Sequence, residues 1–429
     1  MIERLFQLQA HGTTMRREVV AGLTTFLTMA YIIFVNPSIL QLAGMDFGAV
    51  FMATCLAAAF GSAFMGLYAN YPIALAPGMG LNAYFTFGVV KGMGFTWEVA
   101  LGAVFISGLI FLVISLVKLR EMIINAIPMS MKLGIAAGIG LFLGIIALKN
   151  ANVVVAHPAT FVTLGDMKSL PVLLSGLGFA LIAALSARRV PGAIIISILV
   201  VTLVAIPLGL TEFKGITSAP PSMAPTFMKM DIAGALNIGL WSIIFVFLFV
   251  DLFDNTGTLI GVAHRAGLLD KEGKLPRIGR ALVVDSTSAS VGAMLGTSTT
   301  TSYVESAAGV DAGGRTGLTA VVVALCFLAA IFFAPLAGTV PAFATAPALL
   351  YVACLMTMGF KDLDWDDVTE FVPAVVTAIA MPLTFSIAHG IGIGFICYAA
   401  IKILAGRAGE MKIAVPMIAA LFVVKMIVG

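Results

Sequence analysis

The sequence predicts an all-α polytopic membrane protein with about fourteen transmembrane spans in two inverted repeats of seven spans each. Of the 429 residues, 60% are hydrophobic and only 10% are charged, whereas a soluble protein of average composition carries about 25% charged residues. Apolar runs long enough to cross a bilayer, roughly 17 to 25 residues each, recur from residue 17 to the C-terminus. No polar tract is long enough for a separate soluble domain, so the whole chain is expected to form one membrane unit.

The spans are expected where apolar runs lie between turn signals. Their ranges are 17–41, 47–69, 80–91, 97–119, 128–148, 170–187, 191–210, 232–256, 281–297, 303–312, 314–336, 341–360, 366–386 and 388–406. Most basic loop residues then fall on the side of the N-terminus, which the positive-inside rule assigns to the cytoplasm. The apolar stretch 411–428 is compatible with a further crossing, part of a broken last helix, or a helix on the membrane surface.

Spans 3 and 10 are too short to cross a bilayer as regular helices. Each follows an extended piece: "NYPIALAPGMGLNAYF" covers residues 70–85, and "GTSTTTSYVESAAGV" covers residues 296–310. Irregular backbone at membrane depth is tolerated only where it is buried in protein or lines a watery cavity. Interrupted spans in corresponding positions of two halves are typical of the substrate site of a secondary transporter.

Polar residues repeat at the same offset in the two halves. Asn82 follows Tyr31 by 51 residues, and Glu305 follows Asp254 by 51 residues. An internal duplication explains this spacing, and an odd number of spans in each copy turns the second copy upside down. The sequence therefore predicts a substrate site among spans 1, 3, 8 and 10.

Three carboxylates lie in apolar spans: Asp251 and Asp254 in span 8, and Glu305 in span 10. An ionisable residue near the bilayer centre costs about 2.5–3.5 kcal/mol on insertion scales, which makes function the default explanation. Asp254 and Glu305 are predicted to be functional, while Asp251 could equally be a carboxylate that packs against a neighbouring helix. Asn82 is predicted to bind substrate, although its amide could instead tie two interrupted segments together.

Other chemistries have little support. The four cysteines lie in apolar spans without metal-ligand spacing, so neither a disulfide framework nor a metal site is expected. The four histidines fall at span ends or in loops, which leaves a carboxylate to carry any coupled proton. No nucleophile or metal cluster suggests an enzyme, no cofactor is expected, and the N-terminal residues lack the features of a removable signal peptide.

Three segments carry a family resemblance. "APGMGLNAYF", "DLFDNTGTLIG" and "TSTTTSYVESAAGVDAGGRTGLTA" resemble signature segments of the AzgA-like adenine/guanine/hypoxanthine permeases, a branch of the nucleobase–cation symporters that share the uracil-permease fold. The likeness covers essentially the whole chain and implies a homodimer. The implied ranges are 1–16 for a cytoplasmic lead-in, 17–125 and 232–337 for a core domain (spans 1–4 and 8–11), and 126–231 and 338–429 for a gate domain (spans 5–7 and 12–14).

The resemblance also assigns site residues. It places the two substrate-binding acids at Asp254 and Glu305 and a polar partner at Asn82. One position departs from the family pattern, because Asn255 stands where threonine is expected after the span 8 acid. This departure bears on fine substrate preference rather than on the class of substrate.

The chemistry of a purine base fits these residues. The base is flat and neutral, with N–H donors beside acceptors, so carboxylates and free backbone N–H groups at a broken helix could bind its edge. Phe26, Tyr31 or Phe253 could stack on its ring. The candidate substrate-binding residues are Thr28, Tyr31, Asn82, Ala83, Phe253, Asp254, Thr258, Tyr303, Val304 and Glu305, and the candidate proton-coupling residues are Asp254 and Glu305.

The resemblance implies a secondary transporter that imports purine nucleobases (adenine, guanine, hypoxanthine) across the cytoplasmic membrane, by proton symport with elevator-type alternating access. The expected partners are a purine base and the lipid bilayer, and no nucleic acid. The alternative is a transporter of another small nucleobase-like or anionic solute on the same fold. The acids at positions 254 and 305 argue against an anion.

Overall fold

The computed structural model describes residues 2–117, 127–237, 241–269 and 275–428, and this part of the chain is mostly helical. Within it, nine helical segments are long and apolar enough to cross a bilayer. They are Met15–Gln41, Phe47–Ala69, Trp97–Leu116, Met129–Asn150, Leu170–Ala187, Trp241–Arg265, Gly317–Thr339, Ala342–Asp362 and Ile387–Leu404. The expected class, a helical multi-pass membrane protein, is confirmed, while the count of fourteen spans stays a prediction.

The first half of the chain contains two of the longest helices, α6 and α8, and the first interrupted span. Its elements are α1 (Ile2–Phe6), α2 (Met15–Met29), α3 (Ile32–Gln41), α4 (Phe47–Phe64), η1 (Met65–Ala69), β1 (Leu75–Pro77), α5 (Met79–Ala83), η2 (Tyr84–Gly92), α6 (Trp97–Leu116), α8 (Met129–Asn150), β2 (Val154–His157), β3 (Phe161–Leu164), α9 (Leu170–Ala187) and α10 (Ala193–Ala205). Polar residues start several of the helices. The Asp46 side chain accepts a hydrogen bond from Ala49 N at 2.8 Å, for example, and so fixes the start of α4.

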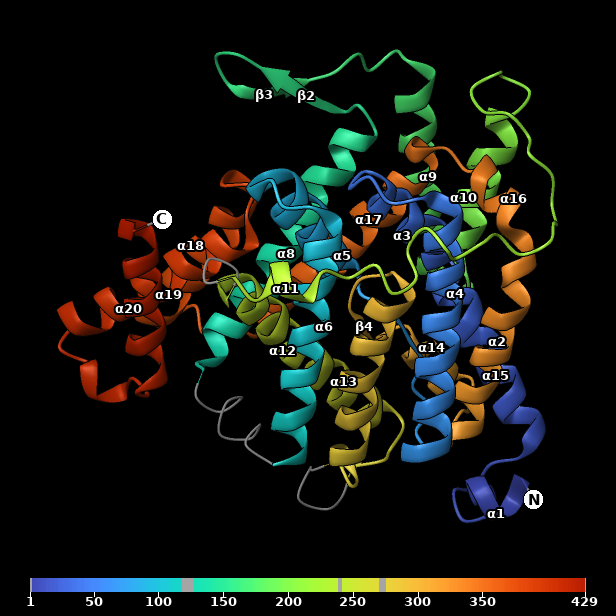
Figure 1. Cartoon of the computed structure of the whole chain (residues 1–429), viewed down its shortest axis with the longest axis horizontal. Helices are drawn as coiled ribbons and strands as arrows, with labels where there is room; N and C mark the ends of the chain where they lie inside the picture. The colour runs from blue at the N-terminus through green and yellow to red at the C-terminus, as the bar shows by residue number, and fades with distance from the viewer. Residues whose placement is uncertain (1, 118–126, 238–240, 270–274, 429) are drawn as a thin grey trace.

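The second half repeats the interrupted span and ends in a group of helices that lies apart at the left of Figure 1. Its elements are α11 (Ile232–Ala235), α12 (Trp241–Arg265), α13 (Ile278–Leu295), β4 (Thr300–Ser302), α14 (Ser306–Asp311), α15 (Gly317–Ala330), η4 (Ile331–Phe333), α16 (Ala334–Thr339), α17 (Ala342–Thr357), η5 (Met358–Asp362), α18 (Val368–Leu383), α19 (Ile387–Leu404), η6 (Ala408–Glu410) and α20 (Ala414–Val428). The apolar stretch 411–428, for which the sequence is compatible with three topologies, contains α20. This helix packs against α19.

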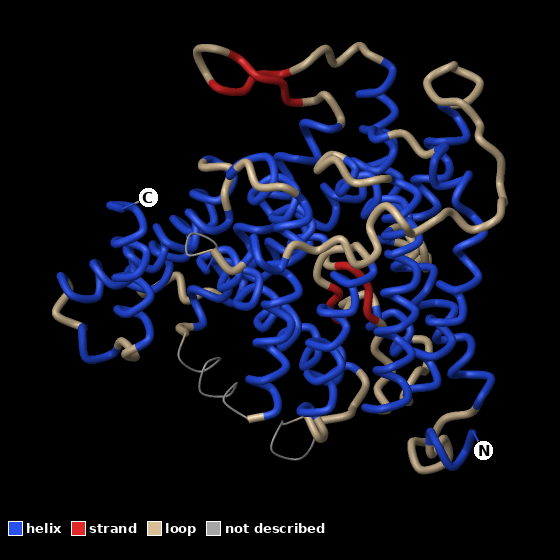
Figure 2. Tube along the Cα trace, in the orientation of Figure 1, coloured by secondary structure: helices blue, strands red, loops and turns tan. Residues whose placement is uncertain are grey.

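The two extended pieces predicted before spans 3 and 10 are present and pair with each other. β1 and β4 form an antiparallel pair in which Leu75 lies opposite Ser302 and Pro77 opposite Thr300. Figure 2 shows this pair in the middle of the helices, far from the exposed hairpin of β2 and β3. The strand pairing satisfies backbone groups that could not face lipid. The short helices α5 and α14 start directly after it.

The helices pack as two groups, each drawing on both halves of the sequence. In the first helix group, α2, α4 and α6 pack against α13 and α15; in the second helix group, α8 packs against α17, α18 and α19, and α9 against α10 and α17. Small residues allow close approach in the first group: a Cβ atom on Gly66 would lie 2.3 Å from the carbonyl oxygen of Gly317. The expected site residues belong to the first group and lie around the strand pair.

Candidate functional site

Glu305 lies where the first span meets the second interrupted span. It directly precedes α14, and its Oε1 accepts a hydrogen bond of 2.6 Å from the hydroxyl of Tyr31, which lies between α2 and α3. The hydroxyl of Thr28 on α2 donates to the backbone oxygen of Glu305 at 3.4 Å. Tyr31 is only 1% exposed and Glu305 is partly buried. The carboxyl of Glu305 is therefore held in place by a rigid neighbour.

Asp254 on α12 has an exposed side chain, and Val304, next to Glu305, is 56% exposed. A carboxylate within a spanning helix is strongly disfavoured against lipid, so the exposed surface around Asp254 and Val304, here named the opening, is expected to face water. Gly257 and Gly261 continue the open face of α12, since within the described part of the chain no atom outside this helix's own backbone lies within 4 Å of a Cβ built on either. Thr258 is partly exposed beside them. The opening thus runs from Asp254 toward the C-terminal end of α12.

Asn255 belongs to a buried network behind this opening. Its Nδ2 donates to Asp251 Oδ1 at 2.8 Å, while its Oδ1 accepts from the hydroxyl of Thr301 at 2.6 Å and from Ser302 N at 2.9 Å. The Ser302 hydroxyl in turn donates to Asp285 Oδ1 on α13 at 2.8 Å. Asn255 therefore ties α12 to β4.

Asn82 lies in a second buried network. It is fully buried; its Nδ2 donates to Asn36 Oδ1 at 2.5 Å, and its Oδ1 accepts from the hydroxyl of Ser298. Asn36 Nδ2 donates to the hydroxyls of Thr54, at 2.6 Å, and Thr297, at 2.9 Å. These contacts join α3, α4 and α5 to the segment before β4. In these contacts Asn82 links two interrupted segments, which is the second of the two roles considered for it. Its partners are Asn36 and Ser298, and neither Asp254 nor Glu305 is among them.

The other candidates divide between scaffold and opening. The Tyr303 hydroxyl donates to the Pro77 backbone oxygen at 2.6 Å, which holds the two interrupted segments together. Ala83 is fully buried, and Phe26 packs edge to face on Phe327 with ring centroids 5.2 Å apart. Of the candidates, the side chain of Phe253 lies outside the described part of the structure.

Two buried carboxylates near these elements were missed from the sequence. Asp285 could have been found by the argument used for Asp254, because it also interrupts an apolar run. Glu18 is fully buried and accepts from Arg315 N at 2.9 Å, Thr316 N at 3.2 Å and the Thr319 hydroxyl at 2.6 Å, so it caps the start of α15. Its position beside two arginines in the sequence hid this role.

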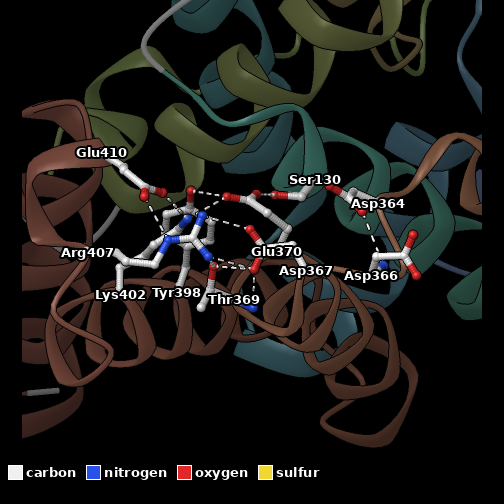
Figure 3. Close-up of polar contacts among 10 residues, drawn as sticks. All are labelled: Ser130, Asp364, Asp366, Asp367, Thr369, Glu370, Tyr398, Lys402, Arg407 and Glu410. Atoms are coloured by element: carbon white, nitrogen blue, oxygen red, sulfur yellow. Dashed lines mark hydrogen bonds and ion pairs between the residues drawn. The ribbon is translucent and has the colours of Figure 1, made fainter.

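The second helix group contains an ion-pair network that the sequence analysis also missed (Figure 3). Lys402 is 1% exposed, and its Nζ lies 2.9 Å from Glu370 Oε1 and 2.7 Å from Glu410 Oε2. The hydroxyls of Tyr398, at 2.9 Å, and Ser130 donate to the two carboxylate oxygens of Glu370. The network joins α8, α18 and α19 to η6.

Arg407 completes this network at the helix ends. It pairs with Asp367 at 2.8 Å and with Glu410 at 2.7 Å. Its hydrogen bond holds the pKa of the Asp367 carboxyl well below its ordinary value, and together with Lys402 it lowers the pKa of Glu410 to about 2. Each charged side chain of the network has a partner of opposite charge. We therefore interpret the network as a structural clamp that holds these helix ends together rather than as a binding site. Among the described residues, no group of three or more His, Cys, Asp or Glu is arranged to hold a metal ion.

The sequence of this chain is similar to the sequences of known permeases. Residues 16–426 match the Permease family (Xan_ur_permease). The chain is 52% identical over 427 residues to the adenine permease AdeP of Escherichia coli (strain K12), covering 100% of this chain and 96% of AdeP. It is 48% identical over 435 residues to the guanine/hypoxanthine permease PbuG of Bacillus subtilis (strain 168), covering 99% of this chain and 98% of PbuG.

A solved structure shares the fold at low identity. The transmembrane domain of the cyanobacterial bicarbonate transporter BicA superposes with a TM-score of 0.66 at 16% identity, covering 88% of this chain and 97% of that domain. At this identity the likeness concerns the fold alone. The family match spans nearly the whole chain, and the relatives match over their full length, so the motif resemblance is confirmed: this chain belongs to the Permease family.

Proposed function

We propose that this chain imports purine nucleobases, and that the pair Asp254 and Glu305 binds the base. The observation that carries the proposal is the arrangement of two carboxyl groups at the opening beside the strand pair, one exposed and one held by Tyr31. Relatives that match over their full length are named adenine and guanine/hypoxanthine permeases, which supports a purine as the substrate.

The chemistry of the site suits a neutral base. A carboxylate oxygen accepts from the N–H groups at the edge of a purine, and two carboxyl groups can accept from different positions on the same ring. Tyr31 holds Glu305 in one orientation, which reduces the cost of ordering this group when the base binds. The same pair of acids disfavours the alternative, an anionic solute, because like charges repel.

We propose proton coupling through the same pair. Asp254 lies on α12 and Glu305 directly precedes α14, and these two helices contact each other. Two carboxyl groups that come close resist ionising together, so one of them holds a proton during part of the cycle. We assign base binding mainly to Asp254, and both binding and proton coupling to Glu305. No other cofactor is needed for this cycle.

Alternating access follows if the two helix groups move past each other. We assign the core domain, 17–125 and 232–337, to the first helix group and the gate domain, 126–231 and 338–429, to the second. The open face of α12 supports an inward-open conformation, since it leads from Asp254 to the C-terminal end of α12, which begins the basic sequence segment 264–280. A homodimer is expected from the family resemblance, and light scattering of the purified protein tests it.

Two substitutions test the site. Asp254→Asn should abolish both purine binding and uptake, because the base loses its main acceptor. Glu305→Gln mimics a permanently protonated acid, so it should keep measurable binding but lose concentrative, pH-dependent uptake. Both quantities are measured across about pH 5 to 8, where a carboxyl in a low-dielectric site would titrate. Asp311→Asn is the matched control, because this carboxylate is 62% exposed at the end of α14.

The outcome separates the assignments. If Glu305→Gln still accumulates purine with the wild-type pH profile, the proton-coupling role of Glu305 is wrong. If competition by adenine, guanine and hypoxanthine is no stronger than by uracil, the purine assignment is wrong.

The proposed orientation places the N-terminus in the cytoplasm of a cell with this protein in its cytoplasmic (inner) membrane. A cysteine at Lys214 should then react with a membrane-impermeant thiol reagent from outside, and one at Arg189 only from inside. Both residues lie outside the long helices. The reverse labelling pattern would overturn the orientation.

A further inference from the structure

A cavity lies on the side of the molecule that carries the β2–β3 hairpin, at the top of Figure 1, away from the N-terminus. This hairpin-side cavity has a volume of about 1020 Å³ and is bounded by α3, α8, α17 and the hairpin. Its lining includes Gln41, Lys149, Thr345, Leu383 and Phe385, and none of the candidate binding residues. The cavity is therefore separated from the site of Asp254 and Glu305.

Phe385 is one of the lining residues of this cavity and lies between the two helix groups. Its ring meets Phe87 of η2 edge to face, with centroids 6.1 Å apart and planes at 88°. It also meets Phe142 of α8, with centroids 5.2 Å apart and planes at 67°. Phe87 belongs to the first helix group and Phe142 to the second. One side chain thus bridges the surfaces that must separate if the two groups move.

The backbone of Phe385 is held in an unfavourable conformation. Its φ of 51° lies in the left-handed region, which is a true outlier for a bulky residue. The turn between α18 and α19 enforces it: Ser386 N donates to Met381 O at 3.1 Å, and the Ser386 hydroxyl caps α19 by accepting from His389 N at 3.2 Å. Residues in such conformations persist only when the surrounding structure fixes them, and they cluster at active sites, ligand clamps and switch regions.

Lys149 covers Phe385 from the cavity. Its Nζ lies 5.9 Å from the centroid of the ring, within the range of a cation–π contact. The ring is thus contacted by Phe87 of η2 and by Phe142 and Lys149 of α8. Phe385 itself is only partly buried and lines the cavity.

We propose that Phe385 is the gate residue that closes the route between the hairpin-side cavity and the substrate site. In the present conformation its ring seals the seam between Phe87 and Phe142. When the helix groups move to open the site to the hairpin side, the contact with Phe87 is lost while Phe385 and Phe142 stay together in the second group. The proposal rests on the alternating access proposed above.

The test measures access to the site rather than uptake. Val304→Cys, in a chain whose four native cysteines are replaced by serine, places a thiol at the site. A membrane-impermeant thiol reagent is added to the hairpin side of membrane vesicles. We expect slow labelling in this background, and labelling faster by about tenfold or more after Phe385→Ala, because two edge-to-face ring contacts are removed. Phe385→Trp, which keeps a ring in the seam, should stay slow.

Two controls make the result specific. Leu383→Cys, 79% exposed in the hairpin-side cavity, should label equally fast with either residue at 385. Phe245→Ala removes an aromatic contact on α12 that involves Phe249 and not Phe385, and should leave the Val304→Cys rate slow. If Leu383→Cys labels only from the opposite side, the proposed orientation is wrong, and the reagent is then applied to the side that labels Leu383→Cys.

An unchanged labelling rate in folded Phe385→Ala overturns the gate assignment. If that variant does not elute as a monodisperse species, Phe385→Leu is used in its place, with an increase of intermediate size expected and an unchanged rate again contradicting the proposal. Purine uptake is measured separately in the wild-type chain: faster labelling in Phe385→Ala together with no purine uptake by the wild-type chain would leave the gate in place and refute the proposed substrate instead.

Discussion

Replacing Asn82 by alanine separates the two roles that this residue could have. In the structure its amide joins Asn36 Oδ1 to the hydroxyl of Ser298, and all three side chains are fully buried. Asn82→Ala leaves both partners without their hydrogen bond. Each unsatisfied buried group costs about 1–3 kcal/mol, so the loss of folding stability should be about 2–6 kcal/mol. That is a large part of the roughly 5–15 kcal/mol available to a typical protein.

The assay is a thermal unfolding curve of the purified protein, with and without a saturating purine. With an unfolding entropy of about 2.1 cal/mol/K per residue, a chain of 429 residues should lose about 2–7 °C in its midpoint. The affinity of the folded fraction for the base should change little. Ser298→Ala removes one of the same contacts, so the double substitution should cost less than the sum of the single ones. Asn237→Ala is the matched control, since this asparagine is exposed in a loop.

The opposite result would refute this reasoning. If Asn82→Ala keeps the wild-type unfolding midpoint but loses purine affinity, the amide contacts the substrate, and the buried network is a minor contribution. An additive double substitution would likewise show that Asn82 and Ser298 act independently.

Two further predictions concern a site contact and a clamp contact. Tyr31→Phe removes the 2.6 Å hydrogen bond to Glu305 and should weaken purine binding by about tenfold or more, as expected for a bond to a carboxyl group; calorimetry at fixed pH measures this, and unchanged affinity would contradict the positioning role. Arg407 and Lys402 lower the pKa of Glu410 from 4.5 to about 2. Because the folded-state value is the lower one, the stabilisation is present above pH 4.5 and is lost as the pH falls toward 2. Arg407→Gln should therefore lower the unfolding midpoint at neutral pH and flatten its acid-induced fall, and parallel curves for variant and wild type would show that the pair contributes nothing.

The class of the protein and the positions of its key acids could be predicted from the sequence, because both follow from local rules. A span must be apolar over its own length, and a charge within it is costly wherever the partner lies. The same holds for the extended pieces before the two short spans, whose residues cannot form a regular helix and which the structure shows as β1 and β4. The repeated offset that relates Asn82 and Glu305 is likewise visible without coordinates.

The partners of those residues were decided only by the tertiary structure. Tyr31 and Glu305 are separated by 274 residues, Asn82 and Ser298 by 216, and Glu18 and Thr316 by 298. Whether a polar side chain faces the opening or a buried network depends on how distant helices pack, and no local pattern encodes that. This is why Asn255, read from the sequence as a departure beside the substrate, is in the structure a bridge between α12 and β4. The sequence determined which polar and charged groups cost free energy in a membrane. Only the packing decided which of these groups find hydrogen-bond partners inside the protein and which face water at the opening.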